Sequence, residues 1–174
     1  MFHSRKKIRL AKYDYSTAGY YFVTICSKDR IEYFGKIENG QIKLGPIGII
    51  AENLWKKIPA RYPVSELDEF VVMPNHLHGI VIIKPGLQKG DTPRHTATPL
   101  LSLVPNSLSS IVNHYKGSVT KECNKNGRSK FQWQGSFYDH VIRDDESLHR
   151  IREYIKNNPL KWELDRNNPQ NLWI

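Results

Sequence analysis

The sequence lacks the features that mark membrane and secreted proteins. Its 174 residues contain no apolar run of the roughly 20 residues that a transmembrane helix needs, and residues 1–7 carry no apolar stretch behind their charges. It has only two cysteines, Cys26 and Cys123, which are too few for a disulfide framework. We therefore expect a cytoplasmic protein in which both cysteines are reduced thiols.

Internal repeats and a domain linker are also absent. The chain is too short for two domains of ordinary size, and its 39% hydrophobic and 25% charged residues are typical of a globular protein. The opening residues are basic and show no clear periodicity. These features predict a single domain over residues 1–174, with a basic N-terminal arm at residues 1–12.

The sequence contains fewer acidic residues than basic ones. There are 17 Asp and Glu residues against 26 Lys and Arg residues, which leaves a formal net charge of +9. A surplus of this size favours a polyanionic partner, because each neutralised phosphate releases condensed counterions. Many basic proteins bind no nucleic acid, so the charge narrows the class of partner and says nothing about chemistry.

Stretches rich in aromatic and β-branched residues predict four main strands, at 20–26, 67–73, 76–83 and 137–143. Pro74-Asn75 forms a tight turn between the middle two, and Asn39-Gly40 centres a small hairpin within 34–44. Residues 85–101 are rich in Gly, Pro, Thr and charge, which indicates a loop.

Apolar residues at helical spacing predict three helices: 46–58, ended by Pro59; 107–122; and a last helix that opens at Asp144 and closes at Pro159. The order strand, helix, strand, strand, helix, strand, helix matches an α+β fold. We expect a ferredoxin-like antiparallel sheet with helices on one face, plus a C-terminal helix. Nucleases and RNA-binding proteins share this fold, so function has to come from the site.

A pair of histidines opens one of the central strands. Side chains two residues apart on a strand share a face, so His76 and His78 project together while Leu77 and Gly79 project from the other face. Two imidazoles held side by side can bind one divalent cation, and the lack of a matched set of cysteines argues against structural zinc. The alternative is that both histidines face solvent or satisfy local hydrogen bonds, and the pair alone leaves it open.

The last helix carries a tyrosine at the edge of its apolar stripe. Tyr154 and Asn158 are four residues apart, so they stack along this edge. A phenol with its ordinary pKa of about 10 is a poor nucleophile at neutral pH, but a nearby cation would polarise a phosphate and orient it for in-line attack. The amide oxygen of Asn158 could join the imidazoles as a ligand of Mg²⁺ or Mn²⁺. Periodicity alone equally fits a packing tyrosine followed by a helix stop.

Several segments together resemble one known family. Residues 71–81 (VVMPNHLHGIV) resemble the His-hydrophobic-His motif of the single-tyrosine HUH transposases, and residues 139–144 and 152–159 resemble the segment that carries their nucleophile. Residues 13–15 and 20–25 are similar to the REP-associated branch of that family. The match extends over nearly the whole chain in the right order, which is more specific than either motif alone.

The resemblance implies a metal-dependent DNA transposase that cuts and rejoins single strands beside DNA hairpins. In this family the tyrosine attacks a phosphate, which gives a 5′-phosphotyrosine link and a free 3′-hydroxyl. His76 and His78 match the metal pair, Tyr154 matches the nucleophile, and Asn158 stands where relatives place a Gln or Asn that completes the metal site. His140 is the rival third ligand, although histidines near such sites often only support a ligand through hydrogen bonds.

Basic and aromatic residues fit the same substrate. The residues that we predict to contact DNA come from the N-terminal arm and from the loop after the helix at 107–122: Arg5, Lys6, Lys7, Arg9, Lys125, Arg128, Lys130 and Trp133. Phe131, Trp133 and Phe137 could stack on unpaired bases. The alternatives are a solvated surface for the charges and core packing for the aromatic rings.

Two other functions stay open on the sequence. One is a DNA- or RNA-binding module on the same fold without catalysis, and the other is a replication- or conjugation-initiating HUH nuclease, which usually has further domains. Insertion-sequence relatives act as dimers that donate the tyrosine helix in trans, whereas REP-associated relatives can act as monomers. The sequence therefore leaves monomer and homodimer open, together with the hairpin recognised and the role in a mobile element or a host.

Overall fold

A four-stranded antiparallel sheet forms the centre of the computed structural model, which describes residues 13–85, 104–165 and 167–168. The strands lie in the order β4-β5-β1-β6 and comprise β1 (Gly19–Cys26), β4 (Ser65–Val72), β5 (His76–Ile83) and β6 (Tyr138–Ile142). The predicted hairpin is present as a separate pair, β2 (Gly35–Glu38) and β3 (Gln41–Leu44). This strand order and its intervening helices are ferredoxin-like, which confirms the predicted fold class.

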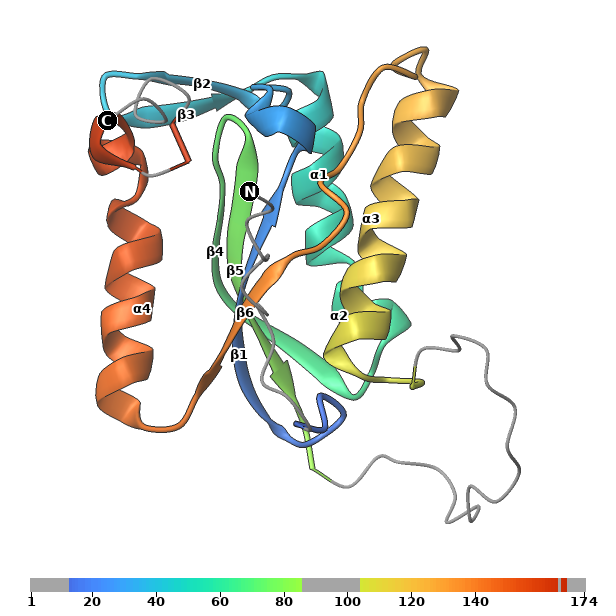
Figure 1. The fold of residues 1–174 in the computed structure, drawn as a ribbon, viewed down its shortest axis with the longest axis vertical. Helices are drawn as coiled ribbons and strands as arrows, with labels where there is room; N and C mark the ends of the chain where they lie inside the picture. The colour runs from blue at the N-terminus through green and yellow to red at the C-terminus, as the bar shows by residue number, and fades with distance from the viewer. Residues whose placement is uncertain (1–12, 86–103, 166, 169–174) are drawn as a thin grey trace, which may run out of the picture.

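The helices divide between the two faces of the sheet (Figure 1). α1 (Pro46–Lys56) and α3 (Leu108–Lys125) pack side by side against one face, and the short α2 (Ile58–Arg61) follows α1. α4 (Asp145–Asn157) lies against the other face and leads into the 3-10 turn η2 (Pro159–Leu164), while η1 (Lys28–Arg30) follows β1. None of the helices in the described segments is both long and apolar enough to cross a membrane.

Alternation along the strands gives each face its own core. The larger core lies on the α1 and α3 side and includes Leu77 and Val81 of β5. The smaller core lies under α4 and consists of Phe22, Ile80, Ile142, Leu148 and Ile155. Since His76 and His78 alternate with Leu77, they project toward the α4 side, where fewer apolar side chains fill the space. Cys26 and Cys123 are buried free thiols, as predicted.

Local sequence explains where several elements begin and end. Asn39 and Gly40 have φ values of 53° and 71°, as a two-residue type I′ hairpin turn requires. Asp144 caps α4 by accepting a hydrogen bond from the backbone N–H of Ser147 at 2.7 Å. One predicted boundary is wrong: α1 ends at Lys56, and Pro59 lies in the first turn of α2. Proline fits there because first-turn N–H groups have no intrahelical partner to lose.

Gly79 allows α1 to pack closely against the sheet. A Cβ atom at Gly79 would lie 2.5 Å from Trp55 Cζ2 and 3.2 Å from Phe70 Cβ. We expect Gly79→Ala to lower the free energy of unfolding by about 1–3 kcal/mol, because the buried indole cannot yield without strain. Gly117→Ala in α3 is the matched control, since nothing lies within 4 Å of a Cβ there and alanine favours a helix. Denaturant unfolding measures both variants, and equal midpoints would contradict this account.

Candidate active site

Two buried histidines lie side by side on the α4 side of β5. His76 and His78 are both 0% exposed, and their Nε2 atoms are 2.9 Å apart. The other ring nitrogen of each is held: His76 Nδ1 lies 2.9 Å from Asn75 Oδ1, and His78 Nδ1 lies 2.9 Å from Thr24 Oγ1. Contacts of this kind orient an imidazole and leave its Nε2 for a metal. The burial excludes a pair that simply faces solvent.

Asp165 completes the group, and sequence reasoning missed it. One ligand atom from each of His76, His78 and Asp165 lies within 4.8 Å of the other two, and all three residues are buried. Asp165 follows η2 in a stretch without helical or strand periodicity, so no spacing rule connects it to the histidines. The available signal, an acidic residue shortly after the tyrosine helix, is too common to single it out.

Asn158 lies beside Asp165 and is also buried, with 3% of its surface exposed. Its Nδ2 donates to Asp165 Oδ2 at 3.2 Å, while its Oδ1 has no hydrogen-bond partner among the residues that the structure describes. A buried carbonyl oxygen without a donor costs about 1–3 kcal/mol. The position therefore suits a cation or a water molecule bound to one.

The donor set fits a divalent cation. Two imidazole nitrogens, a carboxylate and a spare amide oxygen are ligands that Mn²⁺ and Mg²⁺ sites can combine. Neighbouring ligands of an octahedral ion, each about 2.1 Å from it, lie about 3 Å apart, which agrees with the 2.9 Å between the two Nε2 atoms. His76, His78 and Asp165 can therefore hold one metal ion together, with Asn158 beside it.

Tyr154 brings its hydroxyl to the same group from α4. Its Oη lies 3.2 Å from His78 Nε2, and its ring packs edge-on against Phe22 with the ring centroids 6.1 Å apart. The residue is nevertheless 42% exposed. Its ring is anchored while its oxygen can still meet a substrate, and this geometry favours a chemical role over packing alone.

A pocket of about 470 Å³ opens beside Tyr154. Its walls come from β1, β6, α4 and the segment after α4: Phe22, Tyr138, Tyr154, Asn158, Lys161, Leu164 and Asp165. The volume falls in the range of about 300–1,000 Å³ that is typical of small-ligand sites. The pocket is thus lined by Tyr154, by Asn158 and Asp165 of the candidate metal site, and by the positively charged Lys161.

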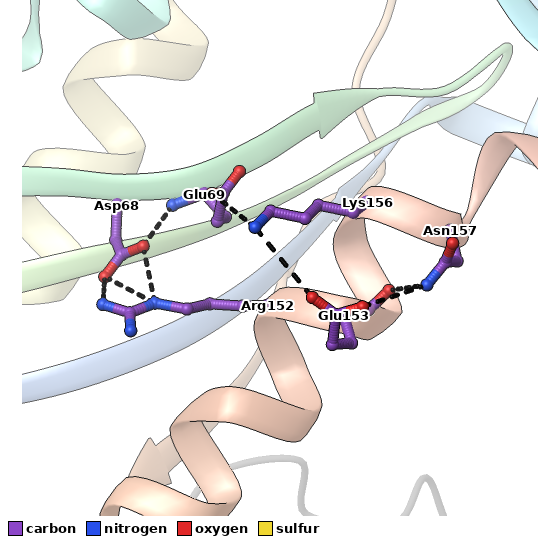
Figure 2. Close-up of polar contacts among 6 residues, drawn as sticks. All are labelled: Asp68, Glu69, Arg152, Glu153, Lys156 and Asn157. Atoms are coloured by element: carbon purple, nitrogen blue, oxygen red, sulfur yellow. Dashed lines mark hydrogen bonds and ion pairs between the residues drawn. The ribbon is translucent and has the colours of Figure 1, made fainter.

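Two ion pairs hold α4 against β4, and we call them the α4 clamp (Figure 2). Arg152 pairs with Asp68 in a bidentate manner, with Nε–Oδ1 and Nη2–Oδ2 distances of 3.0 and 2.5 Å. One turn further along α4, Lys156 Nζ lies 3.2 Å from Glu69 Oε1. Bidentate guanidinium–carboxylate pairs fix geometry as well as distance.

The α4 clamp sets how α4 is rotated about its own axis. The β4 side of the clamp lies at an irregularity, where the pairing with β5 shifts between Leu67 and Phe70, and such irregularities redirect side chains. Residues two apart on a helix project about 200° from each other. Arg152 and Tyr154 therefore lie on opposite flanks of α4, so the ion pairs on one flank position the hydroxyl on the other.

The remaining predicted site residues lie outside this group. His140 is exposed on β6, opposite Phe22, and is not one of the three clustered residues His76, His78 and Asp165. Lys125 is exposed at the last position of α3, three residues beyond the predicted end of that helix. In the loop that follows, Lys130 is exposed and Arg128 is partly exposed. The arm residues Arg5, Lys6, Lys7 and Arg9 lie outside the described residues.

Trp133 requires a correction to the predicted DNA contacts. Its ring centroid lies 5.0 Å from that of Phe131 and 5.4 Å from that of Phe34, and its indole N–H donates to the backbone oxygen of Lys116 at 3.1 Å. Phe131 and Phe137 are buried in the larger core. The structure therefore favours core packing over base stacking for all three predicted rings.

Sequence comparison identifies relatives over most of the chain. No family model matches the sequence. An uncharacterized protein of Haemophilus influenzae is 42% identical over 168 residues, which are 94% of this chain and 93% of that protein. A second H. influenzae protein, described provisionally as a REP-associated tyrosine transposase, is 25% identical over 155 residues, which are 85% of this chain and 74% of that protein.

The fold gives a second comparison. The solved structure of a REP-associated tyrosine transposase bound to a REP hairpin matches with a TM-score of 0.60 and 20% sequence identity, and the match covers 91% of this chain and 76% of that one. At this low sequence identity, the structural match shows a shared fold and no more. The sequence relationship comes from the two H. influenzae proteins. The chain thus belongs to one family with the first H. influenzae protein, and it resembles REP-associated tyrosine transposases both in sequence and in fold.

Proposed function

We propose that the chain is a metal-dependent transposase that cuts and rejoins single-stranded DNA through one tyrosine. The observation that carries the proposal is the 3.2 Å contact between Tyr154 Oη and His78 Nε2, within a buried group that also contains His76 and Asp165. A phenol, two imidazoles and a carboxylate that converge from distant parts of the chain suit attack on a phosphodiester.

Tyr154 is the nucleophile in this proposal. Its Oη bonds to the phosphorus atom while the bond from phosphorus to the 3′ oxygen breaks, and the proton lost by the phenol is balanced by the one that the 3′ oxygen gains. A second 3′-hydroxyl then attacks the same phosphorus and releases the tyrosine, so the phosphodiester is conserved. Mg²⁺ or Mn²⁺, when held by His76, His78 and Asp165, supplies polarisation of the phosphate oxygens.

The proposed substrate is a single strand beside a DNA hairpin. A structural neighbour is bound to a REP hairpin, and the pocket beside Tyr154 carries Lys161 as a contact for phosphate. The formal net charge of +9 favours the same class of partner. The basic residues of the arm and of the loop after α3 are the proposed further DNA contacts.

A covalent-adduct assay tests the proposal. Hairpin DNA with randomised single-stranded flanks and a 3′ label is incubated with the protein and Mn²⁺, and the mixture is run on a denaturing gel. We expect a labelled protein band that disappears with chelator, and peptide mapping should locate the label on Tyr154. DNA binding without any adduct would instead favour the alternative function, a catalytically inactive DNA- or RNA-binding module.

Breaking the α4 clamp is expected to slow cleavage more than it weakens DNA binding. Arg152→Ala removes the bidentate pair, but it should lower the free energy of unfolding by only about 1 kcal/mol, because Arg152 is 38% exposed. Single-turnover cleavage and hairpin affinity, measured in parallel, separate the two effects. Exchanging the charges, in Asp68→Arg combined with Arg152→Asp, should restore part of the rate. A wild-type rate in Arg152→Ala would mean that the clamp does not position Tyr154.

The same ion pair predicts a pH dependence of stability. Hydrogen bonds from Arg152 hold the pKa of Asp68 below its ordinary value. The stabilisation is therefore present above the unfolded pKa of about 3.9 and is lost as the pH falls through the lowered folded pKa. Unfolding midpoints of the wild type and Arg152→Ala should accordingly differ at neutral pH and converge in strong acid.

A further inference from the structure

We infer that Trp162 is a positioning residue of the candidate metal site, because its ring contacts one of the three clustered residues and its backbone holds another. This inference rests on the proposed function, since it concerns the metal that the reaction would use. Trp162 lies in η2, and its indole ring stacks on the imidazole of His76, with the ring centroids 6.0 Å apart and 29° between the ring planes. Trp162 is buried without belonging to either of the two cores that the described residues form. Its place beside His76 is therefore not explained by core packing.

The stacked indole restrains His76 in a way that its hydrogen bond does not. Rotation of a histidine ring about its Cβ–Cγ bond has broad energy minima. The contact between His76 Nδ1 and Asn75 Oδ1 tolerates a range of ring angles, because hydrogen bonds weaken steeply only below about 120°. The lone pair of Nε2 lies in the plane of the ring and has to point at a bound metal. A flat ring packed on the imidazole keeps that plane fixed.

The other histidine of the pair has a stacked ring of its own. Phe22 of β1 stacks on His78 with the ring centroids 5.3 Å apart and 25° between the planes. The imidazoles of His76 and His78 are tilted by 72° relative to each other. Because each imidazole has one aromatic ring on its face, Trp162 and Phe22 together maintain this angle between the two candidate ligands.

An aromatic ring also favours the metal-bound form of His76. A bound divalent cation makes the imidazole that coordinates it more positive. The face of an indole is negative, and it attracts a positive group within about 6 Å of its centroid. The stack between Trp162 and His76 therefore stabilises the ligated imidazole more than the free one. An aliphatic side chain at this position would lack this effect.

The backbone of Trp162 fixes the start of the segment that carries Asp165. The carbonyl oxygen of Trp162 accepts hydrogen bonds from the backbone N–H of Asp165 at 3.0 Å and from Asn168 Nδ2 at 3.1 Å. These bonds close a turn directly after η2, so Asp165 is held at a set position relative to the indole. The ring that orients His76 and the carboxylate that joins it are thus parts of one short, hydrogen-bonded unit.

Mn²⁺ binding in the absence of DNA tests the inference. Trp162→Leu keeps an apolar side chain without an aromatic face, so it should weaken Mn²⁺ binding by about 10–100-fold, as changes outside a ligand set do. Trp162→Phe retains a ring that can stack and should stay within about threefold of the wild type. Titration followed by electron paramagnetic resonance measures both variants. Trp133→Leu is the matched control, because the ring of Trp133 packs against the larger core; it should lower the thermal unfolding midpoint and leave the Mn²⁺ affinity unchanged.

The NMR signals of His76 in the metal-free protein give a second readout, which requires neither metal nor cleavage. Protons over the face of an indole are shifted upfield, so the ring signals of His76 should be upfield in the wild type and lose this shift in Trp162→Leu. A wild-type His76 without the shift would overturn the inference without any variant. Mn²⁺ affinity in Trp162→Leu equal to that of the wild type would also overturn it, as would equal losses in the leucine and phenylalanine variants.

The two readouts distinguish this inference from the proposed function. If the wild type binds Mn²⁺ tightly, Trp162→Leu binds it weakly and no covalent DNA adduct forms, the inference is supported and the proposed function is contradicted. If adducts form and the wild type and Trp162→Leu bind Mn²⁺ equally, the inference alone is contradicted.

Discussion

Tyr154→Phe is expected to abolish the covalent protein–DNA adduct and to lower strand cleavage by about 10³-fold or more, because it removes the oxygen that we propose as the nucleophile. The ring and its edge-on packing against Phe22 are retained, so folding and DNA affinity should change little. Denaturing gels of 3′-labelled DNA measure the adduct, and fluorescence anisotropy measures the affinity.

Tyr138→Phe is the matched control for this prediction. Tyr138 lines the same pocket and is 39% exposed against 42% for Tyr154, but the proposal gives its hydroxyl no part in the reaction. Its phenylalanine variant should still form the adduct. If instead Tyr154→Phe kept the adduct and Tyr138→Phe lost it, the nucleophile would be Tyr138.

His76→Ala and Asp165→Ala should each weaken Mn²⁺ binding by more than the roughly 10–100-fold that changes outside a ligand set produce. Each removes one of the three clustered ligand atoms, so cleavage should also be lost at ordinary metal concentrations. Affinity for hairpin DNA should stay close to that of the wild type, because the proposed phosphate contacts come from basic residues outside the metal group. Titration followed by Mn²⁺ electron paramagnetic resonance measures the metal directly, and His140→Ala serves as the unaffected control.

Asn158→Ala distinguishes two assignments of the third ligand. The family motif favours Asn158, while the geometry favours Asp165, which accepts a hydrogen bond from Asn158 Nδ2 at 3.2 Å. If Asn158 only supports Asp165, Asn158→Ala should weaken Mn²⁺ binding by about 10–100-fold and Asp165→Ala by more. The opposite order of the two effects would make Asn158 the ligand.

The fold was predictable because its signals are local. β5 begins at His76 and ends at Ile83, as the apolar run between Pro74-Asn75 and Lys84 predicts, and Asp144 caps α4 as an acidic residue before a helix should. The predicted end of the first helix was wrong at Pro59, because a residue that usually ends helices here lies in the first turn of a new one. Local propensity does not distinguish these two uses of proline.

The site was predictable only where its residues share a strand or a helix. The shared face of His76 and His78 follows from strand geometry, and the place of Tyr154 at the edge of α4 follows from helix geometry. The position of Asp165 beside the histidines depends on the path that the chain takes after η2. No periodicity in the sequence predicts that path. Trp133 was predicted to contact DNA because it follows a basic loop in the sequence, although its partly buried ring packs against the larger core.

Alternate residues of β5 serve two different purposes, one set in the hydrophobic core and the other in the candidate metal site. Leu77 and Val81 belong to the larger core, whereas His76 and His78 face α4. A library that varies the side chains facing α4 can therefore explore other metals or target sequences, while the hydrophobic layer beneath them continues to hold the sheet together. This separation makes the chain a suitable scaffold for engineering strand-cutting enzymes of altered specificity.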